Sequence, residues 1–422
     1  MKRITKLALA ALAAGMLLTG CSKAAKGPVT VEIWHTFDQK REEGLKTIVD
    51  SYNASQNKVV VELKKQDNAG FNDTVYNAVA NGIGPSIIFN YGTTAVDYAN
   101  EGLAIDIKKY IEKDNKKGDK QMQNLIDSLP EAMKTDALGF EDGGIYYLPG
   151  CTTGPVYFYN KTIFDELGLT PPTTWDELEY VSKTIYEKKG IPGFHSDGLV
   201  DNLQALIMQN GLGYIDVANK KVTFAGDKMA EIYQWYADMC NKGYFEFNTI
   251  GRYSSEDFSN GDVASFSGSN VNDLYITMVE GKGEFAITKW IAGDFYTAWN
   301  RGPIFLHRND DVDAAAYNFA KYFFQKENIV TWAIANSALC PYGIAENVPA
   351  YIEYLNNLGP KSALPSVLAN LPVSGSFPNV TGSAAVRKAL EEYLNYVVDG
   401  KMTAKDAVAA LEKDCNDALN GR

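Results

Sequence analysis

Hydrophobic and polar residues alternate in patterns that predict an α/β arrangement. Val29 to Trp34 alternate as in a strand, and the apolar residues of 45–52 then recur with helical spacing. A second strand over 59–63, a short helix over 71–78 and a buried strand over 86–90 follow. The connections are long enough for crossovers, so this order predicts a mostly parallel sheet covered by helices.

The second half of the chain repeats the alternation of strand and helix. A glycine-rich stretch over 139–150 predicts a domain crossing, and a strand over 156–159 follows it. Thr174 and Glu177 have the spacing of a capping box, which predicts that a helix begins there. Further strand-like runs occupy 263–266, 284–290 and 295–299, and the apolar face over 386–397 predicts a late helix.

The first twenty residues have the pattern of an export signal and not of a folded element. Lys2, Arg3 and Lys6 precede an apolar stretch over 7–18 that is too short to span a membrane stably. The stretch ends in Leu18-Thr19-Gly20-Cys21, which resembles a bacterial lipobox, the motif whose cysteine becomes the lipid-modified first residue. We therefore expect a signal peptide over 1–20 and a lipidated tether over 21–27. The alternative is an ordinary secretory peptide with a chance cysteine.

Composition and charge narrow the class of protein further. The chain has 422 residues, enough for two or three domains, and 45% of them are hydrophobic. Removing residues 1–20, which carry three basic and no acidic residues, changes the formal net charge from −12 to −15. Such an acidic chain is disfavoured as a binder of nucleic acid or of anionic lipid. We expect it in the cell envelope, anchored by lipid outside the cytoplasm, on the outer face of the cytoplasmic membrane or in the periplasm.

Signatures of metal binding and catalysis are sparse. The three histidines do not form an HExxH pair, no Cys-x-x-Cys occurs, and no glycine pattern matches a nucleotide-binding loop. We expect no metal, no cofactor and no enzyme activity. We also expect buried free thiols at the cysteines downstream of the tether, which are Cys151, Cys240, Cys340 and Cys415.

Aromatic residues gather where predicted strands end. Trp34 to Phe37 follow the first strand, Asn90 to Thr94 follow the third, and Trp299 to Arg301 follow a later one. Ligands of open α/β sheets gather at the carboxyl ends of strands, so these turns are candidates for one site. Aromatic faces with amide and hydroxyl neighbours suit a sugar or polyol, whose C–H face stacks on the ring. For each tryptophan alone, packing in the core is the alternative interpretation.

One long segment resembles a known family. Residues 155–168 (PVYFYNKTIFDELG) and 171–178 (PPTTWDEL) are similar to a characteristic segment of the extracellular solute-binding proteins of bacterial ABC importers, in the branch that binds sugars and glycerol phosphate. Ile33-Trp34-His35, Gly82 to Pro85, the run over 258–264 and Pro341 are similar in order and spacing. The departure from the family pattern is at Gly150-Cys151.

The resemblance implies the two-lobe α/β fold of periplasmic binding proteins (type II), with the ligand in the cleft between the lobes. It implies a first lobe over 28–140 and 297–328, and a second over 141–296 and 329–422. The expected partners are a small-molecule solute, an ABC permease and the membrane through Cys21, and we expect a monomer. The candidate ligand-binding residues are Trp34, Phe37, Asp38, Phe71, Asn90, Tyr91, Thr152, Thr153, Ser267, Gly268, Ser269, Trp299, Asn300 and Arg301.

The sequence leaves two classes of solute open, a neutral sugar and an anionic polyol. Glycerol-phosphate binders of the family carry an acidic residue after the third strand and a late arginine, whereas this chain has Asn90-Tyr91 and the uncharged loop 374–379. This favours a sugar or oligosaccharide. Arg301 keeps a glycerol phosphate or glycerophosphodiester as the alternative, since a guanidinium suits a phosphate or carboxylate. An exported carbohydrate-active enzyme and a binding protein that reports to a membrane sensor are further hypotheses.

Overall fold

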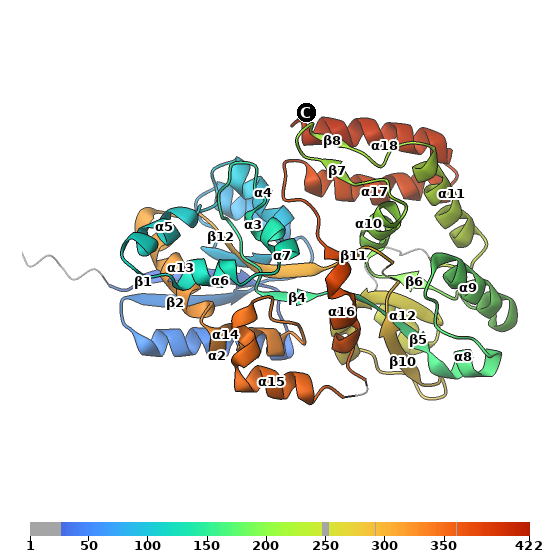
Figure 1. Ribbon diagram of the computed structural model, residues 1–422, viewed down its shortest axis with the longest axis horizontal. Helices are drawn as coiled ribbons and strands as arrows, with labels where there is room; N and C mark the ends of the chain where they lie inside the picture. Colours follow the sequence, from blue (N-terminus) through green and yellow to red (C-terminus); the bar gives the residue numbers. More distant parts are fainter. Residues whose placement is uncertain (1–26, 247–252, 292, 360) are drawn as a thin grey trace, which may run out of the picture.

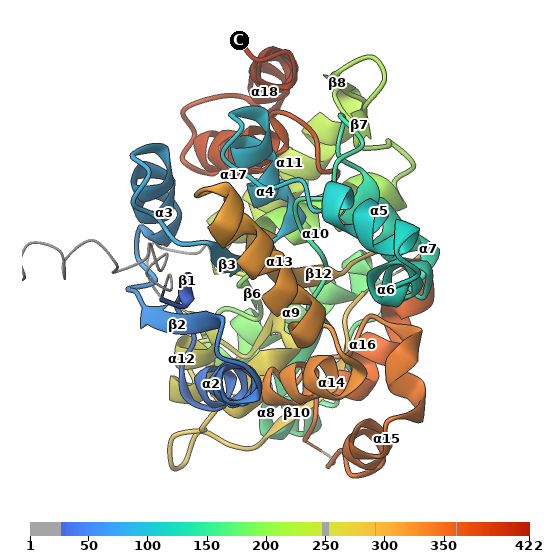
Figure 2. The same ribbon diagram turned by 90° about the vertical axis from the view of Figure 1, so that its left-hand side faces the viewer.

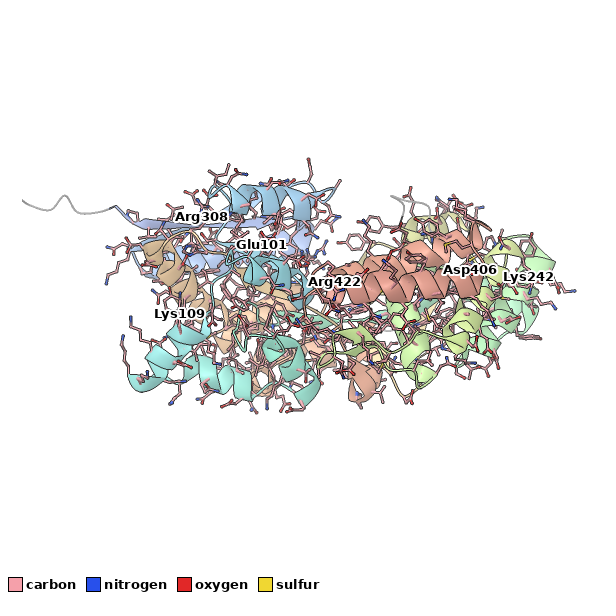
Figure 3. The ribbon with its side chains drawn as sticks, turned by 90° about the horizontal axis from the view of Figure 1, so that it is seen from above. Glu101, Lys109, Lys242, Arg308, Asp406 and Arg422 are labelled. Atoms are coloured by element: carbon pink, nitrogen blue, oxygen red, sulfur yellow. The ribbon has the colours of Figure 1, made fainter. Side chains whose placement is uncertain are left out.

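The computed structural model describes residues 27–246, 253–291, 293–359 and 361–422. The predicted signal peptide, Cys21 and nearly all of the predicted tether lie outside the described residues. The chain forms two α/β lobes that lie next to each other along the long axis of the molecule (Figure 1). Seen from above, Lys109 and Arg308 mark the first lobe, and Lys242 and Asp406 mark the far end of the second (Figure 3).

The first lobe contains a five-stranded sheet in the order β2-β1-β3-β12-β4. Its strands are β1 (Val29–His35), β2 (Val59–Lys65), β3 (Ile87–Asn90), β4 (Cys151–Thr153) and β12 (Trp299–Phe305). β1 runs parallel to β2 and β3, as the βαβαβ pattern predicts, while β12 is antiparallel to both β3 and β4. The late strand β12 therefore enters the sheet next to the early strand β3.

Helices cover both faces of this sheet because its strands bury both faces. Val31 and Ile33 contribute to a core under the helix α2, whereas Ile88 and Ile304 contribute to a second core under α3 and α4. Figure 2 shows α2 and α3 on opposite sides of β1 and β2. The helices of this lobe are α2 (Gln39–Ser55), α3 (Phe71–Ala80), α4 (Gly92–Asn100), α5 (Lys108–Lys116), α6 (Gln121–Asp127), α7 (Glu131–Leu138), α13 (Asp310–Phe323), α14 (Lys326–Ala335) and α15 (Pro349–Asn356).

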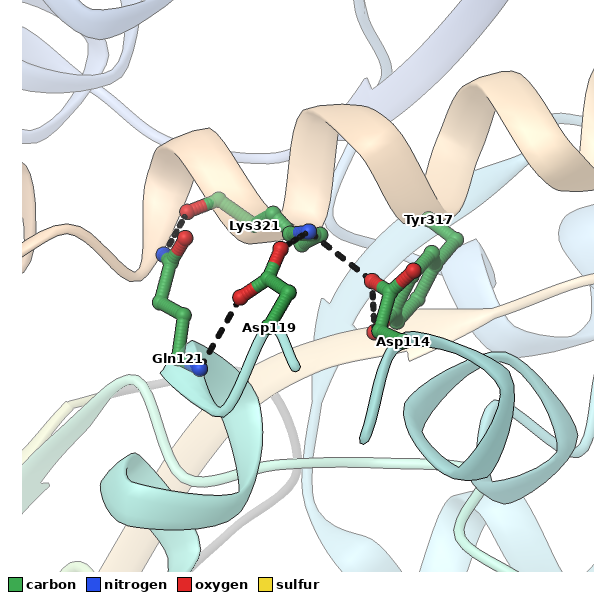
Figure 4. A network of polar contacts seen from close by, with 5 residues as sticks. All are labelled: Asp114, Asp119, Gln121, Tyr317 and Lys321. Atoms are coloured by element: carbon green, nitrogen blue, oxygen red, sulfur yellow. Dashed lines mark hydrogen bonds and ion pairs between the residues drawn. The ribbon is translucent and has the colours of Figure 1, made fainter. Parts of the chain in front are cut away.

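A polar network connects α13 to the end of α5, the start of α6 and the segment between them (Figure 4). The ammonium of Lys321 lies 2.8 Å from Asp114 Oδ2 and also pairs with Asp119. The Tyr317 hydroxyl donates to the same Asp114 oxygen at 3.1 Å, and the Gln121 side chain donates to the Lys321 carbonyl at 2.5 Å. Lys321 of α13 thus connects this late helix to α5 and to the start of α6, which come much earlier in the chain.

The second lobe is built on a four-stranded sheet in the order β10-β5-β9-β6. Its strands are β5 (Pro155–Asn160), β6 (His195–Ser196), β9 (Ser265–Ser269) and β10 (Phe285–Lys289), with a hairpin of β7 (Ile215–Asp216) and β8 (Lys221–Val222) and a pair of β11 (Tyr296–Thr297) and β13 (Ser374–Gly375). Its helices are α8 (Lys161–Leu167), α9 (Trp175–Lys189), α10 (Leu199–Gln209), α11 (Asp227–Asn241), α12 (Ser254–Asn260), α16 (Leu364–Asn370), α17 (Ser383–Val398) and α18 (Ala404–Leu419).

The capping signal at Thr174 is confirmed. The Thr174 hydroxyl accepts a hydrogen bond from the Glu177 amide at 3.2 Å, and the Glu177 carboxylate accepts one from the Thr173 amide at 2.7 Å. These bonds satisfy amide groups that have no partner within the first turn of a helix. No helix within the described ranges has both the length and the apolar run needed to cross a bilayer.

The chain crosses between the lobes at three places. The crossings lie between β4 and β5, between β11 and β12, and between Asn356 and Ala363. The middle crossing lies near the predicted boundary at residue 297.

The other two crossings correct the boundaries that we expected at 140 and 328. Residues 145–151 contribute to the first core, because β4 pairs with β12, and Ile329 and Trp332 of α14 are also buried there. The structure therefore assigns 141–153 and 329–356 to the first lobe and not to the second.

Candidate functional site

A cavity of about 810 Å³ lies between the two lobes. The first lobe lines it with residues that follow β2 and β3, with one residue of α7 and with the start of β12. The second lobe lines it with residues near the ends of β6 and β9, with the segment before α17 and with one residue of α17. The full lining is Asn68, Ala69, Tyr91, Gly92, Thr93, Asp136, Asp197, Gly198, Asp201, Tyr253, Ser269, Asn272, Ala298, Trp299, Asn300, Ser376, Phe377 and Arg387. The cavity thus lies where the carboxyl ends of strands from both sheets meet, as is typical of ligand sites in α/β proteins.

Four aromatic side chains contribute to this lining. Tyr91 and Tyr253 expose 42% and 63% of their surface, which leaves their rings available to a ligand. Trp299 is half-buried at the start of β12, and a Cβ atom on Gly198 would approach its ring to 3.2 Å. A side chain at position 198 would therefore press on the Trp299 ring from the opposite lobe. Such rings offer stacking surfaces to the weakly apolar face of a sugar.

Asp136 of α7 is a buried carboxylate at the wall of the cavity, with 5% of its surface exposed. Burial raises its pKa to about 6, although hydrogen bonds from Asn300, Tyr147, Asn379 and Ser376 act in the opposite direction. Two of these donors, Ser376 and Asn379, belong to the segment before α17. Asp136 thus links an element of the first lobe to a segment of the second.

The other charged groups of the cavity have partners within the protein. Asp197 accepts hydrogen bonds from the Ser254 amide at 2.7 Å and from the Asn272 side chain at 2.8 Å. Asp201 lies 3.2 Å from the Arg387 guanidinium. The lining therefore carries three carboxylates and one guanidinium, which already has a carboxylate partner. This balance disfavours an anionic group in the large cavity.

Four of the predicted binding residues line the large cavity, namely Tyr91, Ser269, Trp299 and Asn300. Three others line a second cavity of about 410 Å³, namely Phe71, Asn90 and Arg301. The remaining seven line neither cavity: Trp34, Phe37, Asp38, Thr152, Thr153, Ser267 and Gly268.

The residues after β1 lie away from the cavities because they pack or pair locally. Phe37 is buried in the first core, with ring centroids 5.6 Å from Phe89 and 5.0 Å from Trp332. The Trp34 indole donates to Glu32 at 3.2 Å. Asp38 pairs with a lysine on the adjacent strand β2 at 2.6 Å. These three side chains support the fold and do not reach the cavity.

The remaining four predicted residues also lie outside both cavities, but several of them contact residues that line the large cavity. The Thr152 hydroxyl donates to the Asn300 side chain at 2.8 Å, and the Thr153 hydroxyl donates to the Trp299 carbonyl at 3.5 Å. A Cβ on Gly268 would approach Asn272 and Asp197 to 2.6 and 2.7 Å, so this position needs a glycine. These positions set the geometry behind the lining.

Sequence reasoning missed most of the polar groups of the cavity. Asn68 follows β2, so the rule of the strand ends applied to every predicted strand would have found it. Asp197 follows β6, whose two residues are too short for an alternating pattern. Asp136 and Arg387 lie on helices, where no local signal distinguishes them from solvent-facing charges.

One group of potential metal ligands lies outside the cavity lining. His195, Glu246 and Asp257 place ligand atoms within 4.8 Å of one another. The sequence argument against a metal considered spacing along the chain, and these residues come from three distant segments. The absence of a metal stays a prediction.

Comparisons with known proteins agree with this architecture. The model of a family described as bacterial extracellular solute-binding protein matches residues 47–342. The sn-glycerol-3-phosphate-binding periplasmic protein UgpB of Brucella abortus (strain 2308) is 24% identical over 447 residues, covering 98% of this chain and 99% of that protein.

Two solved structures share the fold over almost the whole chain. The cyclic alpha-maltosyl-1,6-maltose binding protein of Arthrobacter globiformis superposes with a TM-score of 0.74 at 23% identity, covering 94% of this chain and 100% of that chain. An ABC substrate-binding protein of Listeria monocytogenes in complex with cycloalternan has a TM-score of 0.78 at 17% identity, covering 93% and 99%.

Proposed function

Because this chain belongs to the family of bacterial extracellular solute-binding proteins, which are transport receptors and not enzymes, we propose that it captures a carbohydrate between its lobes. It then delivers that solute to the transmembrane permease of an ABC importer. The observation that carries the proposal is the cavity between the lobes, where four aromatic rings alternate with amide, hydroxyl and carboxylate groups.

The chemistry of the lining favours a carbohydrate over a small phosphate ester. Asn272, Asn300 and Ser376 offer hydrogen bonds to hydroxyl groups, while Tyr91 and Trp299 offer ring faces. A cavity of about 810 Å³ lies within the range of sites for drug-sized ligands and far exceeds a three-carbon solute. The solved relatives named above are described as binding cyclic oligosaccharides, which supports the same class.

Glycerol 3-phosphate or a glycerophosphodiester is the second candidate. The likeness to UgpB over nearly the full length favours it. The charges of the large cavity disfavour such a phosphate ester. Its three carboxylates would repel a phosphate, and its single guanidinium already has Asp201 as partner.

A thermal-shift screen of the protein lacking residues 1–21 tests the proposal. The panel contains neutral mono- and oligosaccharides, uronic acids, sugar phosphates, glycerol phosphates and their diesters. A ligand that binds only the folded state raises the melting temperature by mass action, so we expect a rise with at least one carbohydrate. A rise confined to glycerol phosphates would replace the carbohydrate proposal by the second candidate. No rise with any member would refute both.

The membrane anchor is a separate part of the proposal. The lipobox supports lipidation of Cys21, which would hold a monomeric receptor at the membrane outside the cytoplasm. Replacing Cys21 by serine is expected to move the protein from the membrane fraction to the soluble envelope fraction. An unchanged distribution between the fractions would contradict anchoring through this residue.

A further inference from the structure

A second cavity of about 410 Å³ adjoins the large one and shares Asn68 with it. Its wall combines the first turn of α3 with the end of β3 and one residue of β12. The lining residues are Asn68, Gly70, Phe71, Asn72, Asp73, Asn90 and Arg301. This cavity is small and polar, and it differs from the large one in the sign of its buried charge.

Arg301 provides that charge, and its guanidinium pairs with no carboxylate among the described residues. Its Nε donates to the Phe89 carbonyl at 3.3 Å, and its guanidinium lies 4.9 Å from the centre of the Phe37 ring. Among the described residues, Arg301 forms no ion pair, and its two terminal nitrogens donate no hydrogen bond to protein. The group that faces the cavity is therefore a cation with free donors.

A second cation increases this imbalance. Arg41 lies over the same Phe37 ring at 5.8 Å, and its side chain donates to the Tyr275 hydroxyl but forms no ion pair within the described ranges. Burial lowers the pKa of Arg301, and the charge of Arg41 lowers it further. Two guanidinium groups that lie against one phenyl ring, and that form no ion pair among the described residues, favour the binding of an anion from a ligand.

The remaining lining is rich in hydrogen-bond donors. The Asn90 amide donates to Asn72 at 2.9 Å and accepts from the Tyr91 backbone at 2.9 Å, so its orientation is fixed. This leaves the Asn72 amide nitrogen available to a ligand. The amino end of α3 adds the positive end of a helix dipole on the same side. Asp73 is the one carboxylate of this lining, and its residue is exposed.

We propose that the second cavity is a subsite for one anionic group of the bound carbohydrate, a carboxylate or a phosphate, held by Arg301. This inference rests on the proposed function, because it places the sugar rings in the large cavity and the anionic end beyond Asn68. The acidic lining of the large cavity and the cation of the small one would then orient the ligand along the cleft.

Calorimetric titration with matched probes tests the subsite. The probes are glucose, glucuronate and glucose 6-phosphate, which share a ring and differ in the charged group, and inorganic phosphate alone. We expect one of the charged sugars to bind about tenfold or more tightly than glucose, as is typical of hydrogen bonds to charged groups. Arg301→Gln should abolish this preference. Arg308→Gln removes the same charge from the outside of the first lobe (Figure 3) and should leave it unchanged.

A second pair of variants guards against misfolding of the Arg301 variant. Asn72→Asp places a negative charge on the lining, at an exposed position of α3, and should lower the affinity for the charged sugar at least tenfold. Asn77→Asp adds the same charge at an exposed position farther along the helix and serves as its control.

The outcomes separate this inference from the proposed function. Equal binding of glucose and the charged sugars, or a preference that survives both Arg301→Gln and Asn72→Asp, would overturn the subsite while carbohydrate binding stands. Binding of inorganic phosphate that depends on Arg301, with no carbohydrate bound, would refute the proposed function and would replace the carbohydrate subsite by a site for a free anion.

Discussion

Asp136 should make the stability of the protein fall as the pH rises from about 4 to above 6. Its pKa of about 6 in the folded protein exceeds the ordinary value of 3.8 because the carboxyl is buried. The folded state therefore holds its proton more tightly than the unfolded state does. Between these two pKa values the folded state binds more protons, so stability decreases with rising pH. Below pH 3.8 the carboxyl is protonated in both states and its ionisation lowers the stability by nothing. Above pH 6 it is ionised in both states, and the full loss of stability is present.

The size of this effect follows from the shift. A shift of about two pKa units, at about 1.4 kcal/mol each, corresponds to about 3 kcal/mol. Asp136→Asn cannot titrate, so its stability relative to the wild type should rise by about this amount between pH 4 and pH 7. The variant has a constant cost at all pH values, since its amide cannot accept from all of the donors that face the carboxylate. The prediction therefore concerns how the difference in free energy of unfolding between Asp136→Asn and the wild type changes with pH. It does not concern the size of that difference at any single pH.

Denaturant unfolding of both proteins at pH 4, 5, 6 and 7 measures this difference. The exposed Asp262 provides a control, because Asp262→Asn removes the same formal charge without removing a buried group. The control should follow the wild type across the series. Parallel pH profiles for the wild type and Asp136→Asn would refute the claim that burial controls this carboxyl.

Three further predictions concern the site, the fold and the thiols. Trp299→Ala should weaken carbohydrate binding by about 1 to 3 kcal/mol in calorimetry, the range for a central stacking ring. The control variant Trp34→Phe should leave the affinity unchanged. Equal affinities of Trp299→Ala and the wild type would place Trp299 among the packing residues. Lys321→Met should lower the free energy of unfolding by about 1 kcal/mol, because two carboxylates lose a partly buried partner; an unchanged denaturation midpoint would contradict this. Burial raises the pKa of each described thiol to about 12, so the native protein lacking residues 1–21 should react slowly with a disulfide reagent at pH 8. After unfolding, the same protein should yield four reactive thiols. Fast reaction of the native protein would contradict the burial of these thiols. These thiols belong to Cys151, Cys240, Cys340 and Cys415.

Periodicity along the chain predicted the long elements and failed for the short ones. The strand over 29–34 and the helix with apolar residues over 45–52 correspond to β1 and α2. The run over 295–299 was predicted as one strand but is divided between β11, which pairs with β13, and β12, which pairs with β3 and β4. Alternation reports that side chains face opposite sides, and it contains no information about which strand lies alongside.

The site was predictable only as far as it depends on strand ends. Tyr91 follows a buried strand that the pattern identifies, and the rule for α/β sheets places it correctly. Phe37 also follows a predicted strand, yet its ring packs in the core against Phe89 of β3 and Trp332 of α14. Arg387 reaches the cavity because α17 packs on the second lobe, a tertiary arrangement without a local signal.

The same strand pair that carries the site also joins the lobes. Trp299 is paired with Thr153 at the adjacent crossings, and a Cβ on Gly154 would approach the Tyr296 hydroxyl to 2.1 Å. Gly154 therefore permits a contact between the crossings that any other residue would prevent. Trp299 and Asn300 line the cavity directly beside this contact. The side chains best placed to contact a solute therefore lie directly beside the two segments through which the chain passes from one lobe to the other.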